Sequence, residues 1–477
     1  MAQSFLFYDL ETSGFNPRTD RVMQFAAQRT TLDLQPIGEP TNTLIRLSDD
    51  VLPSPDAVLV TGITPQKTRT EGVPEAEFLR YFSEHLAVPG TIFVGYNTVR
   101  FDDEFMRFML YRNFYDAYEW QYKDNSGRWD LLDTIRMTRA LRPAGINWPV
   151  DSQDKPTNRL ELLATINKLD HANAHDALSD VRVTIELARL MRSKQPKLFD
   201  YQLSLRDKKS VAQLVNSQPL FVYTSGKYDS KFEKTTVVAK LCDHPNGRGV
   251  LVYDVRYDPA PYMKMSREEL AEAWRYKRDS NELRLPIKTL MFNRCPAVAP
   301  LSVLDDDSQK RLQLDLPALH RHALALRASA GKQLATNVIS ALELLDEQQK
   351  TPSSATVNDQ DVDGALYEAF FNDKDKRLMQ QVRRASPKDL TVLAETISEP
   401  RLAALLPLYK ARNFPADLTD TERAQWDKHV HNTLFGKDKK LQTYMARIEE
   451  LATHKGTSKS DAFVLGELRL YGESLLP

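Results

Sequence analysis

The sequence is poor in cysteine and has no long apolar run, and each shortage makes whole classes of protein implausible. Cys242 and Cys295 are its two cysteines, too few for a disulfide framework, although they could still pair, so we expect a reducing, cytoplasmic location. Neither lies in a Cys-x-x-Cys or Cys/His cluster, which argues against structural zinc. No apolar stretch reaches the ~18 residues that span a bilayer, and residues 1–9 lack the basic region of a signal peptide.

An excess of charge of one sign is also missing. The 64 basic and 65 acidic residues leave a net charge of −1. Any surface that binds a polyanion must therefore be local rather than global. Hydrophobic residues make up 42% of the chain and aromatic residues 9%, which is ample for cores. A chain of this length predicts two or three domains.

The apolar patterns change along the chain and predict its domain organisation. Residues 1–200 alternate strand-like and helix-like segments, which is typical of α/β layers around a central sheet. Residues 201–350 contain short β-branched and aromatic runs, which predict a small β-rich domain with helical insertions. Residues 351–362 form a polar linker. The apolar spacing over 363–477 is helical and predicts a C-terminal helical domain.

Individual elements of the first region can also be predicted. We expect strands over 5–10, 22–30, 43–47 and 91–95, and helices over 74–85, 102–114, 160–169 and 176–192. Thr64 and Pro65 have the residue types of a helix N-cap and a first helical position. In the β-rich region, Asn246-Gly247 lies between two apolar runs and predicts a hairpin turn.

Asp9 and Glu11 end the apolar run that begins at Phe5. Residues two apart on a strand point to the same face, about 7 Å apart along the strand. Two carboxylates held together repel each other, and a divalent cation between them relieves the repulsion. A D-x-E pair taken alone is more often a surface feature at the end of a strand, so other acids must support a metal site.

Two later segments supply such acids. Asp102 follows the strand ending at Gly95 and would lie where a loop enters a helix, a place where ligand-binding groups gather in α/β sheets. Its alternative role is a helix N-cap. His175 and Asp180 can converge if His175 lies in an entry loop and Asp180 in the first turns of the next helix, where Asn173 and Asp176 are plausible caps. The alternative is a solvated histidine at a surface helix start.

Asp9-x-Glu11-Thr12, Asn97-x-x-x-Phe101-Asp102 and His175-x-x-x-x-Asp180, in this order, resemble the three motifs of the DEDDh 3′→5′ exonucleases, which have a ribonuclease-H-like α/β fold. The chain resembles the bacterial exonuclease I family more closely, over nearly its whole length. That family is specific for single-stranded DNA. Further matching segments are 25–27, 61–66, 111–116, 128–133, 141–149, 159–161, 198–201 and 409–415.

The resemblance implies an exonuclease domain, an SH3-like β-rich domain and a helical domain. It implies processive 3′→5′ degradation of single-stranded DNA to 5′-mononucleotides, in DNA repair or recombination. Asp9, Glu11 and Asp180 would bind two Mg²⁺ ions, for which Mn²⁺ can substitute, and Asp102 would bind them directly or through water. His175, whose reference pKa is near 6.5, would be the general base. Glu11 would also contact the substrate.

The segment after Asp102 interleaves basic and aromatic residues, as a channel for a single strand requires. With the help of the resemblance, we expect strand contacts from Arg107, Tyr118, Tyr122, Arg136 and Arg159. Acids interleave here too, so a core patch with a solvated charged face is the alternative, and Trp129 is a candidate core residue.

The resemblance also implies docking of the acidic, apolar C-terminal tail of single-stranded DNA-binding protein. Arg142 and Tyr201 are the candidate contacts, with a surface charge and a core ring as their alternatives. We expect a monomer. Three rival functions remain: an exoribonuclease of the same superfamily, since the motifs do not separate DNA from RNA, a non-catalytic strand-binding module, and an α/β protein with coincidental carboxylates.

Overall fold

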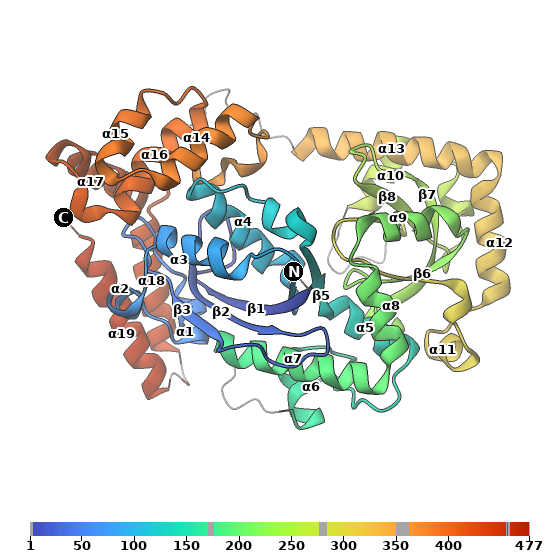
Figure 1. The fold of residues 1–477 in the computed structure, drawn as a ribbon. Coiled ribbons are helices and arrows are strands. Elements are labelled where there is room, and N and C mark those ends of the chain that lie inside the picture. The colour runs from blue at the N-terminus through green and yellow to red at the C-terminus, as the bar shows by residue number, and fades with distance from the viewer. Residues whose placement is uncertain are drawn as a thin grey trace. The chain divides into compact units, whose positions relative to one another are not determined.

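The chain forms two compact units in a computed structural model (Figure 1), which describes residues 3–169, 176–275, 284–349, 362–454, 456 and 458–476. The first unit comprises residues 1–127, 171–184 and 354–477, and the second comprises 128–170 and 185–353. The domain boundaries predicted after residues 200, 350 and 362 stay predictions. Nearly all of the predicted linker lies outside the described residues.

A five-stranded sheet has β1 at its centre, in the order β3-β2-β1-β4-β5. β1 pairs with β2 antiparallel and with β4 parallel, and β2 pairs with β3 antiparallel. The strands are β1 (Ser4–Thr12), β2 (Val22–Thr30), β3 (Thr41–Leu44), β4 (Thr91–Gly95) and β5 (Gly127–Asp130). β2 and β4 have their predicted bounds. The strand predicted over 43–47 lies earlier, because Ile45 makes only an isolated bridge to Val73.

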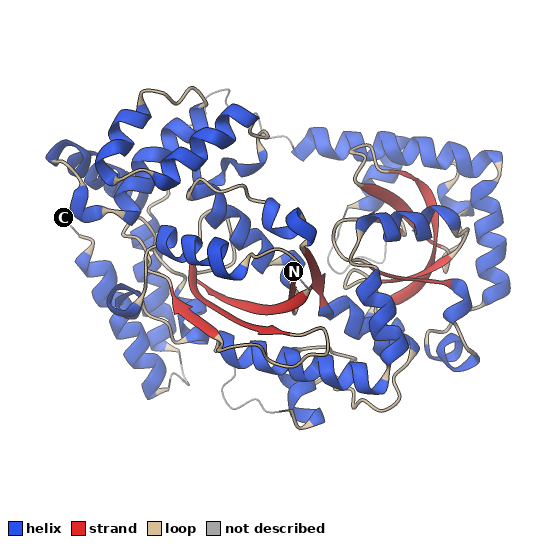
Figure 2. Ribbon diagram, in the orientation of Figure 1, coloured by secondary structure: helices blue, strands red, loops and turns tan. Residues whose placement is uncertain are grey.

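One face of this sheet is covered by helices of the first unit (Figure 2). Leu6, Tyr8 and Leu10 of β1 share a buried cluster with Phe78, Phe82, Phe105 and Met109. The helices before and after β4 are α1 (Pro55–Thr61), α2 (Pro65–Glu71), α3 (Glu75–Tyr81), the π-helix η1 (Phe82–Leu86), the 3₁₀-helix η2 (Thr98–Arg100) and α4 (Asp102–Arg112). Thr64 caps α2 as predicted, accepting a hydrogen bond from the Lys67 amide.

The C-terminal residues of the first unit are helical, as predicted, and no strand occurs among the described residues after 362. Leu402, Leu405 and Leu406 pack against Phe108 and Tyr111 of α4 in one buried cluster. The helices are η8 (Val362–Tyr367), α14 (Asp373–Arg384), α15 (Pro387–Ala394), α16 (Pro400–Asn413), α17 (Asp420–Phe435), α18 (Lys440–Thr453) and α19 (Lys459–Ser474).

The second unit contains the predicted β-rich region, an antiparallel sheet in the order β10-β6-β7-β8-β9. Its strands are β6 (Phe221–Thr224), β7 (Thr235–Asp243), β8 (Gly249–Asp254), β9 (Ile287–Met291) and β10 (Ala297–Pro300). Asn246 and Gly247 lie in the β7–β8 turn as predicted, with φ of 68° at Gly247. Cys242 and Cys295 are free thiols, so the two cysteines do not pair.

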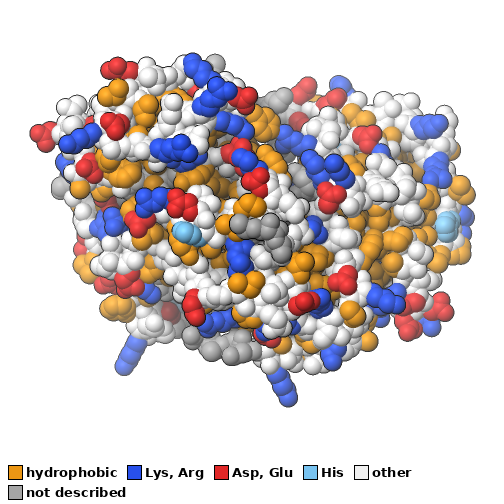
Figure 3. All heavy atoms as spheres, viewed as in Figure 1, with side chains coloured by type: hydrophobic (Ala, Val, Ile, Leu, Met, Phe, Trp, Pro, Cys, Tyr) orange, Lys and Arg blue, Asp and Glu red, His pale blue; other side chains and the backbone are white. Residues whose placement is uncertain are grey.

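The second unit also contains helices. They are α5 (Leu131–Leu141), α6 (Leu160–Asn167), most of α7 (Ala177–Lys194), α8 (Pro196–Ser204), α9 (Lys208–Ser217), α10 (Arg267–Trp274), α11 (Asp306–Arg311), α12 (Leu316–Arg327) and α13 (Ser329–Gln349). Among the described residues, no helix combines the length and apolar character needed to cross a membrane. Basic and acidic side chains are interspersed over the face seen in Figure 3, in keeping with the balanced charge.

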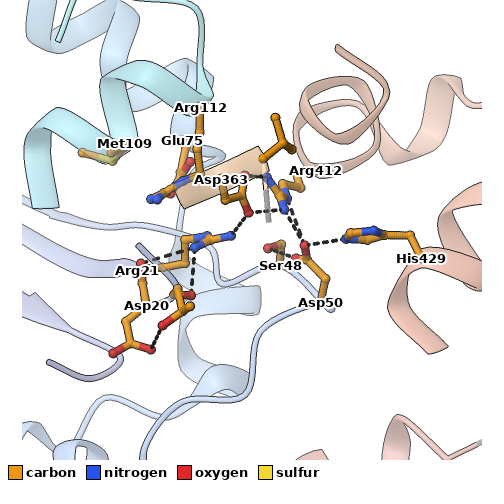
Figure 4. A network of polar contacts seen from close by, with 12 residues as sticks. Asp20, Arg21, Ser48, Asp50, Glu75, Met109, Arg112, Asp363, Arg412 and His429 are labelled. Carbon is orange, nitrogen blue, oxygen red and sulfur yellow. Dashed lines mark hydrogen bonds and ion pairs between the residues drawn. The ribbon is translucent and has the colours of Figure 1, made fainter. Parts of the chain in front are cut away.

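A buried network of arginines and aspartates joins the N-terminal residues of the first unit to its C-terminal helices (Figure 4). Arg412 of α16 donates to both carboxylate oxygens of Asp363, at 2.8 and 2.7 Å, and to Asp50 at 2.6 Å. Arg21 donates to Asp363 at 2.6 Å, and His429 Nε2 lies 3.3 Å from Asp50. The side chains of Arg412 and Asp50 are 8% and 3% exposed. Multiple hydrogen bonds therefore offset the cost of burying these charges.

This network predicts that acid destabilises the first unit. Burial alone would raise the pKa of Asp50 and Asp363, but Arg412 and its neighbours hold both values well below the usual range. A carboxyl with a lowered pKa in the folded state contributes stability above about pH 4, and this is lost as the pH falls through the folded pKa. Urea unfolding between pH 7 and pH 3 measures the loss. Asp363→Asn should weaken the dependence, and an unchanged dependence would contradict the assignment.

Candidate active site

The site begins near the C-terminal end of β1, where Asp9 and Glu11 project from one face of the strand. Leu10 between them points into the helix-covered core, as the two-residue period requires. In the register with β2, Asp9 lies opposite Ala26 and Glu11 opposite Gln24, and the register shifts between Glu11 and Thr12. A register shift of this kind interrupts the regular hydrogen bonding between the two strands and changes the direction of the side chains beside it. Glu11 is therefore the last residue of β1 in the regular register with β2.

Asp102 reaches the same region through β4. Phe7 of β1 pairs with Val94 in the parallel register, which brings the end of β4 beside Asp9. The chain passes close to β1 at Gly95, where a Cβ would lie 3.0 Å from the Tyr8 carbonyl oxygen. Asp102 is then the first residue of α4 and is 4% exposed. The N-cap position belongs to Phe101, so the interpretation of Asp102 as a helix cap is wrong.

A neighbouring acid that the sequence reasoning missed holds α4 against β1. The hydroxyl of Tyr8 donates to Asp103 Oδ1 at 2.7 Å, and Asp103 is 1% exposed. This bond fixes the first turn of α4, and with it the backbone of Asp102, relative to the strand that carries Asp9. In the sequence, Asp103 is visible only as a second acid directly after Asp102, and the fold is needed to show that its partner is Tyr8.

Asp180 completes the cluster from the first turn of α7. One carboxylate oxygen from each of Asp9, Glu11 and Asp180 lies within 4.8 Å of the others. Asp176 accepts a hydrogen bond from the Ser179 amide at 3.3 Å, as the predicted cap should, and one from Gln24 of β2 at 3.2 Å. Asn173 and His175 lie outside the described residues, so their roles stay predictions.

The carboxylates raise one another's pKa. Burial is the largest cause for Glu11, followed by the charges of Asp180, Asp102 and Asp176, and together they raise its pKa to about 8. Burial, then Asp102, Glu11, Asp180 and Asp176, raises the pKa of Asp9 well above its usual range. Asp102 thus belongs to the cluster electrostatically. This crowding costs free energy that a bound cation offsets.

The donor set fits a divalent metal ion. Three carboxylate groups offer oxygen ligands within 4.8 Å of one another, and hard divalent cations prefer such ligands. No sulfur or described imidazole joins the group, so a soft metal is not favoured. The fold and this cluster define a class of α/β protein in which carboxylates at the end of a central strand are arranged to bind divalent cations.

Three of the predicted strand contacts lie in the first unit. Arg107 is 7% exposed, and its guanidinium lies 5.5 Å from the centre of the Tyr118 ring. Tyr118 is half-buried, whereas Tyr122 is 64% exposed. Arg107 donates to Glu104 at 2.6 Å and to Gln121 at 2.9 Å, so its charge is largely compensated within the unit.

The other predicted contacts lie in the second unit. Arg136 pairs with Asp133 at 2.6 Å, while Arg159 is exposed and 3.7 Å from Glu161. Arg142 lies 3.1 Å from Asp305 and donates to the Val303 carbonyl at 2.8 Å. Tyr201 is half-buried among apolar side chains, and burial raises its pKa to about 12. The expected core residue Trp129 is 2% exposed, which confirms its packing role.

Three family models match the chain in succession. They are described as exonuclease, over residues 6–188, exonuclease I SH3-like domain, over 206–342, and exonuclease I C-terminal domain, over 360–475. Exodeoxyribonuclease I of Escherichia coli (strain K12) is 36% identical to the chain, covering 99% of the chain and 98% of the relative. The chain belongs to the exodeoxyribonuclease I family.

Solved structures agree over the full length. A crystal structure of E. coli exonuclease I in complex with a dA16 oligonucleotide has a TM-score of 0.93 and 36% identity, covering 99% of this chain and all of that one. The zinc-bound form of an E. coli exonuclease I complex with single-stranded DNA has a TM-score of 0.92 and 36% identity, with full coverage of both chains. The expected three-part α/β, SH3-like and helical architecture is confirmed.

Proposed function

We propose that this exodeoxyribonuclease removes 5′-mononucleotides processively from the 3′ end of single-stranded DNA by metal-assisted phosphodiester hydrolysis. The convergence of Asp9, Glu11 and Asp180 within 4.8 Å carries the proposal. A cluster of acids repels the phosphate backbone of DNA unless a cation lies between the carboxylates and the phosphate. With a metal ion bound, the same carboxylates would hold the phosphate through that ion.

Each acidic residue has a distinct place in the proposed reaction. Asp9, Glu11 and Asp180 would hold two Mg²⁺ ions, with Mn²⁺ able to substitute, and Asp102 would act directly or through water. Such ions stabilise the attacking and leaving oxygens of an in-line displacement. Glu11 would also contact the terminal nucleotide. His175 would take the proton from the attacking water.

The remaining residues are proposed to hold the strand and a partner. Aromatic rings and basic groups at Arg107, Tyr118, Tyr122, Arg136 and Arg159 would stack on bases or contact phosphates. For Arg142 and Tyr201, the combination of a cation and a half-buried ring would suit an acidic, apolar peptide such as the C-terminal tail of single-stranded DNA-binding protein. We propose a cytoplasmic monomer that acts in DNA repair.

The proposal predicts a strong preference for single-stranded DNA. A 5′-labelled oligonucleotide should shorten one nucleotide at a time with Mg²⁺ present, while its duplex and its RNA counterpart should be digested at least about tenfold more slowly. Denaturing gels that resolve single nucleotides measure this. Faster digestion of RNA would favour the exoribonuclease alternative, and equal digestion of duplex DNA would overturn strand specificity.

A further inference from the structure

An exposed pair of aromatic side chains lies beside α4, on residues that the sequence analysis did not select. Phe370 is 77% exposed and Tyr367 is 51% exposed. Both come from the segment that opens the C-terminal helices, η8 and the residues after it. Both rings expose apolar surface whose burial against a ligand would be favourable.

These rings extend the surface formed by Arg107 and Tyr118. The ring centres of Phe370 and Tyr118 are 6.3 Å apart. Tyr367 meets Phe108 of α4 edge to face at 5.6 Å, and its hydroxyl donates to Glu104. Glu104 also accepts from Arg107 at 2.6 Å. One carboxylate therefore fixes both the tyrosine from η8 and the arginine that lies over Tyr118.

The backbone that carries the two rings is held firmly. Arg401 of α16, which is 3% exposed, donates to the carbonyls of Ala365 and Ala369 at 3.1 and 2.9 Å. Its guanidinium also lies 4.4 Å from the centre of the Phe371 ring, which packs inward near Tyr111. Phe371 thus anchors the segment while its neighbour Phe370 faces solvent. Pre-ordered rings lose little entropy when they bind.

The position of this surface points to one ligand. Glu104 and Arg107 follow Asp102 on the same helix, so the surface begins within about 8 Å of Asp102 along the helix axis. We infer that Phe370 and Tyr367, together with Tyr118, form a base-stacking platform for the single strand whose 3′ end lies at the acidic cluster. The inference rests on the proposed function and adds two C-terminal residues to its substrate surface.

The chemistry of the platform favours stacking over phosphate binding. Arg107 is already paired with Glu104 and Gln121, so the platform adds ring faces rather than free positive charge. Stacking on aromatic rings tolerates any base, which suits an enzyme that must pass a whole strand. Affinity at this platform should depend on the bases and little on salt.

Binding of a fluorescent single-stranded 12-mer, measured by anisotropy without divalent metal, tests the platform. Phe370→Ala and Tyr367→Ala should each weaken binding about fivefold or more. Tyr367→Phe keeps the ring and should bind within about twofold of the unchanged protein. Phe463→Ala is the matched control, because Phe463 is a similarly exposed ring, at 69%, on α19. Its replacement should leave binding of the 12-mer unchanged. Thermal unfolding checks that all four variants are folded at the assay temperature.

A second oligonucleotide separates stacking from other contacts. With abasic residues at every position of the 12-mer, the loss caused by Phe370→Ala should disappear. Equal binding by Phe370→Ala, Tyr367→Ala and the unchanged protein would overturn the platform, and so would a loss that persists on the abasic strand. Failure of the proposed function is distinct, since it appears as absent digestion by the unchanged protein, while the binding comparison needs no catalysis.

Discussion

Replacing Asp180 by Ala should lower the rate of single-strand digestion by at least about a thousandfold. Asp180 is one of the three carboxylates whose oxygens lie within 4.8 Å, so its loss removes a ligand from the centre that would stabilise the reacting oxygens. That stabilisation is worth several kcal/mol, and each 1.36 kcal/mol changes a rate tenfold. Initial rates on a 5′-labelled oligonucleotide measure the effect.

Strand binding by the Asp180→Ala variant should stay within about threefold of the unchanged protein, because the rings and basic groups that hold the strand are other residues. Glu186→Ala is a suitable control. Glu186 lies on the same helix, and its half-exposed carboxylate pairs with Arg189 rather than with the cluster, so digestion should be nearly unchanged. If Asp180→Ala retained activity, Asp180 would no longer qualify as a metal ligand.

Replacing Arg412 by Ala should destabilise the first unit by about 3–5 kcal/mol. Arg412 donates to both Asp363 and Asp50, and removal of the cation from a buried ion pair leaves uncompensated charge behind. Urea denaturation followed by circular dichroism at pH 7 gives the free energy of unfolding. The free energy of unfolding of Arg412→Lys should lie between those of Arg412→Ala and the unchanged protein, since an ammonium group cannot reproduce the paired guanidinium bonds.

Arg447→Ala provides the matched control for this effect. Arg447 also binds an aspartate through two hydrogen bonds, to Asp56 at 3.0 and 2.6 Å, but both side chains are substantially exposed, at 38% and 46%. An exposed pair contributes little to stability, because solvent screens its charges. Equal losses in the two variants would show that burial does not govern the strength of the Arg412 network.

The residue pattern predicted the acidic cluster better than it predicted the surrounding surface. Alternation along β1 places Asp9 and Glu11 on one face, and this follows from strand geometry whatever the rest of the chain does. The entry of Asp102 from the end of β4 follows from the usual site of polar groups in α/β sheets. The mixture of charged and aromatic residues in this segment does not tell which rings are exposed, as Tyr122 is, and which are buried, as Trp120 is.

The sequence by itself determined the α/β character of its first part, the β-rich and helical regions and the carboxylates of the cluster, because these depend on local periodicity and residue type. Only the tertiary structure decided that Asp103 binds Tyr8, that Arg412 joins Asp50 to Asp363, and that Phe370 faces solvent while Phe371 packs inward. Such contacts join residues far apart in the chain, and no local pattern specifies the partner of a buried charge or the exposure of a ring.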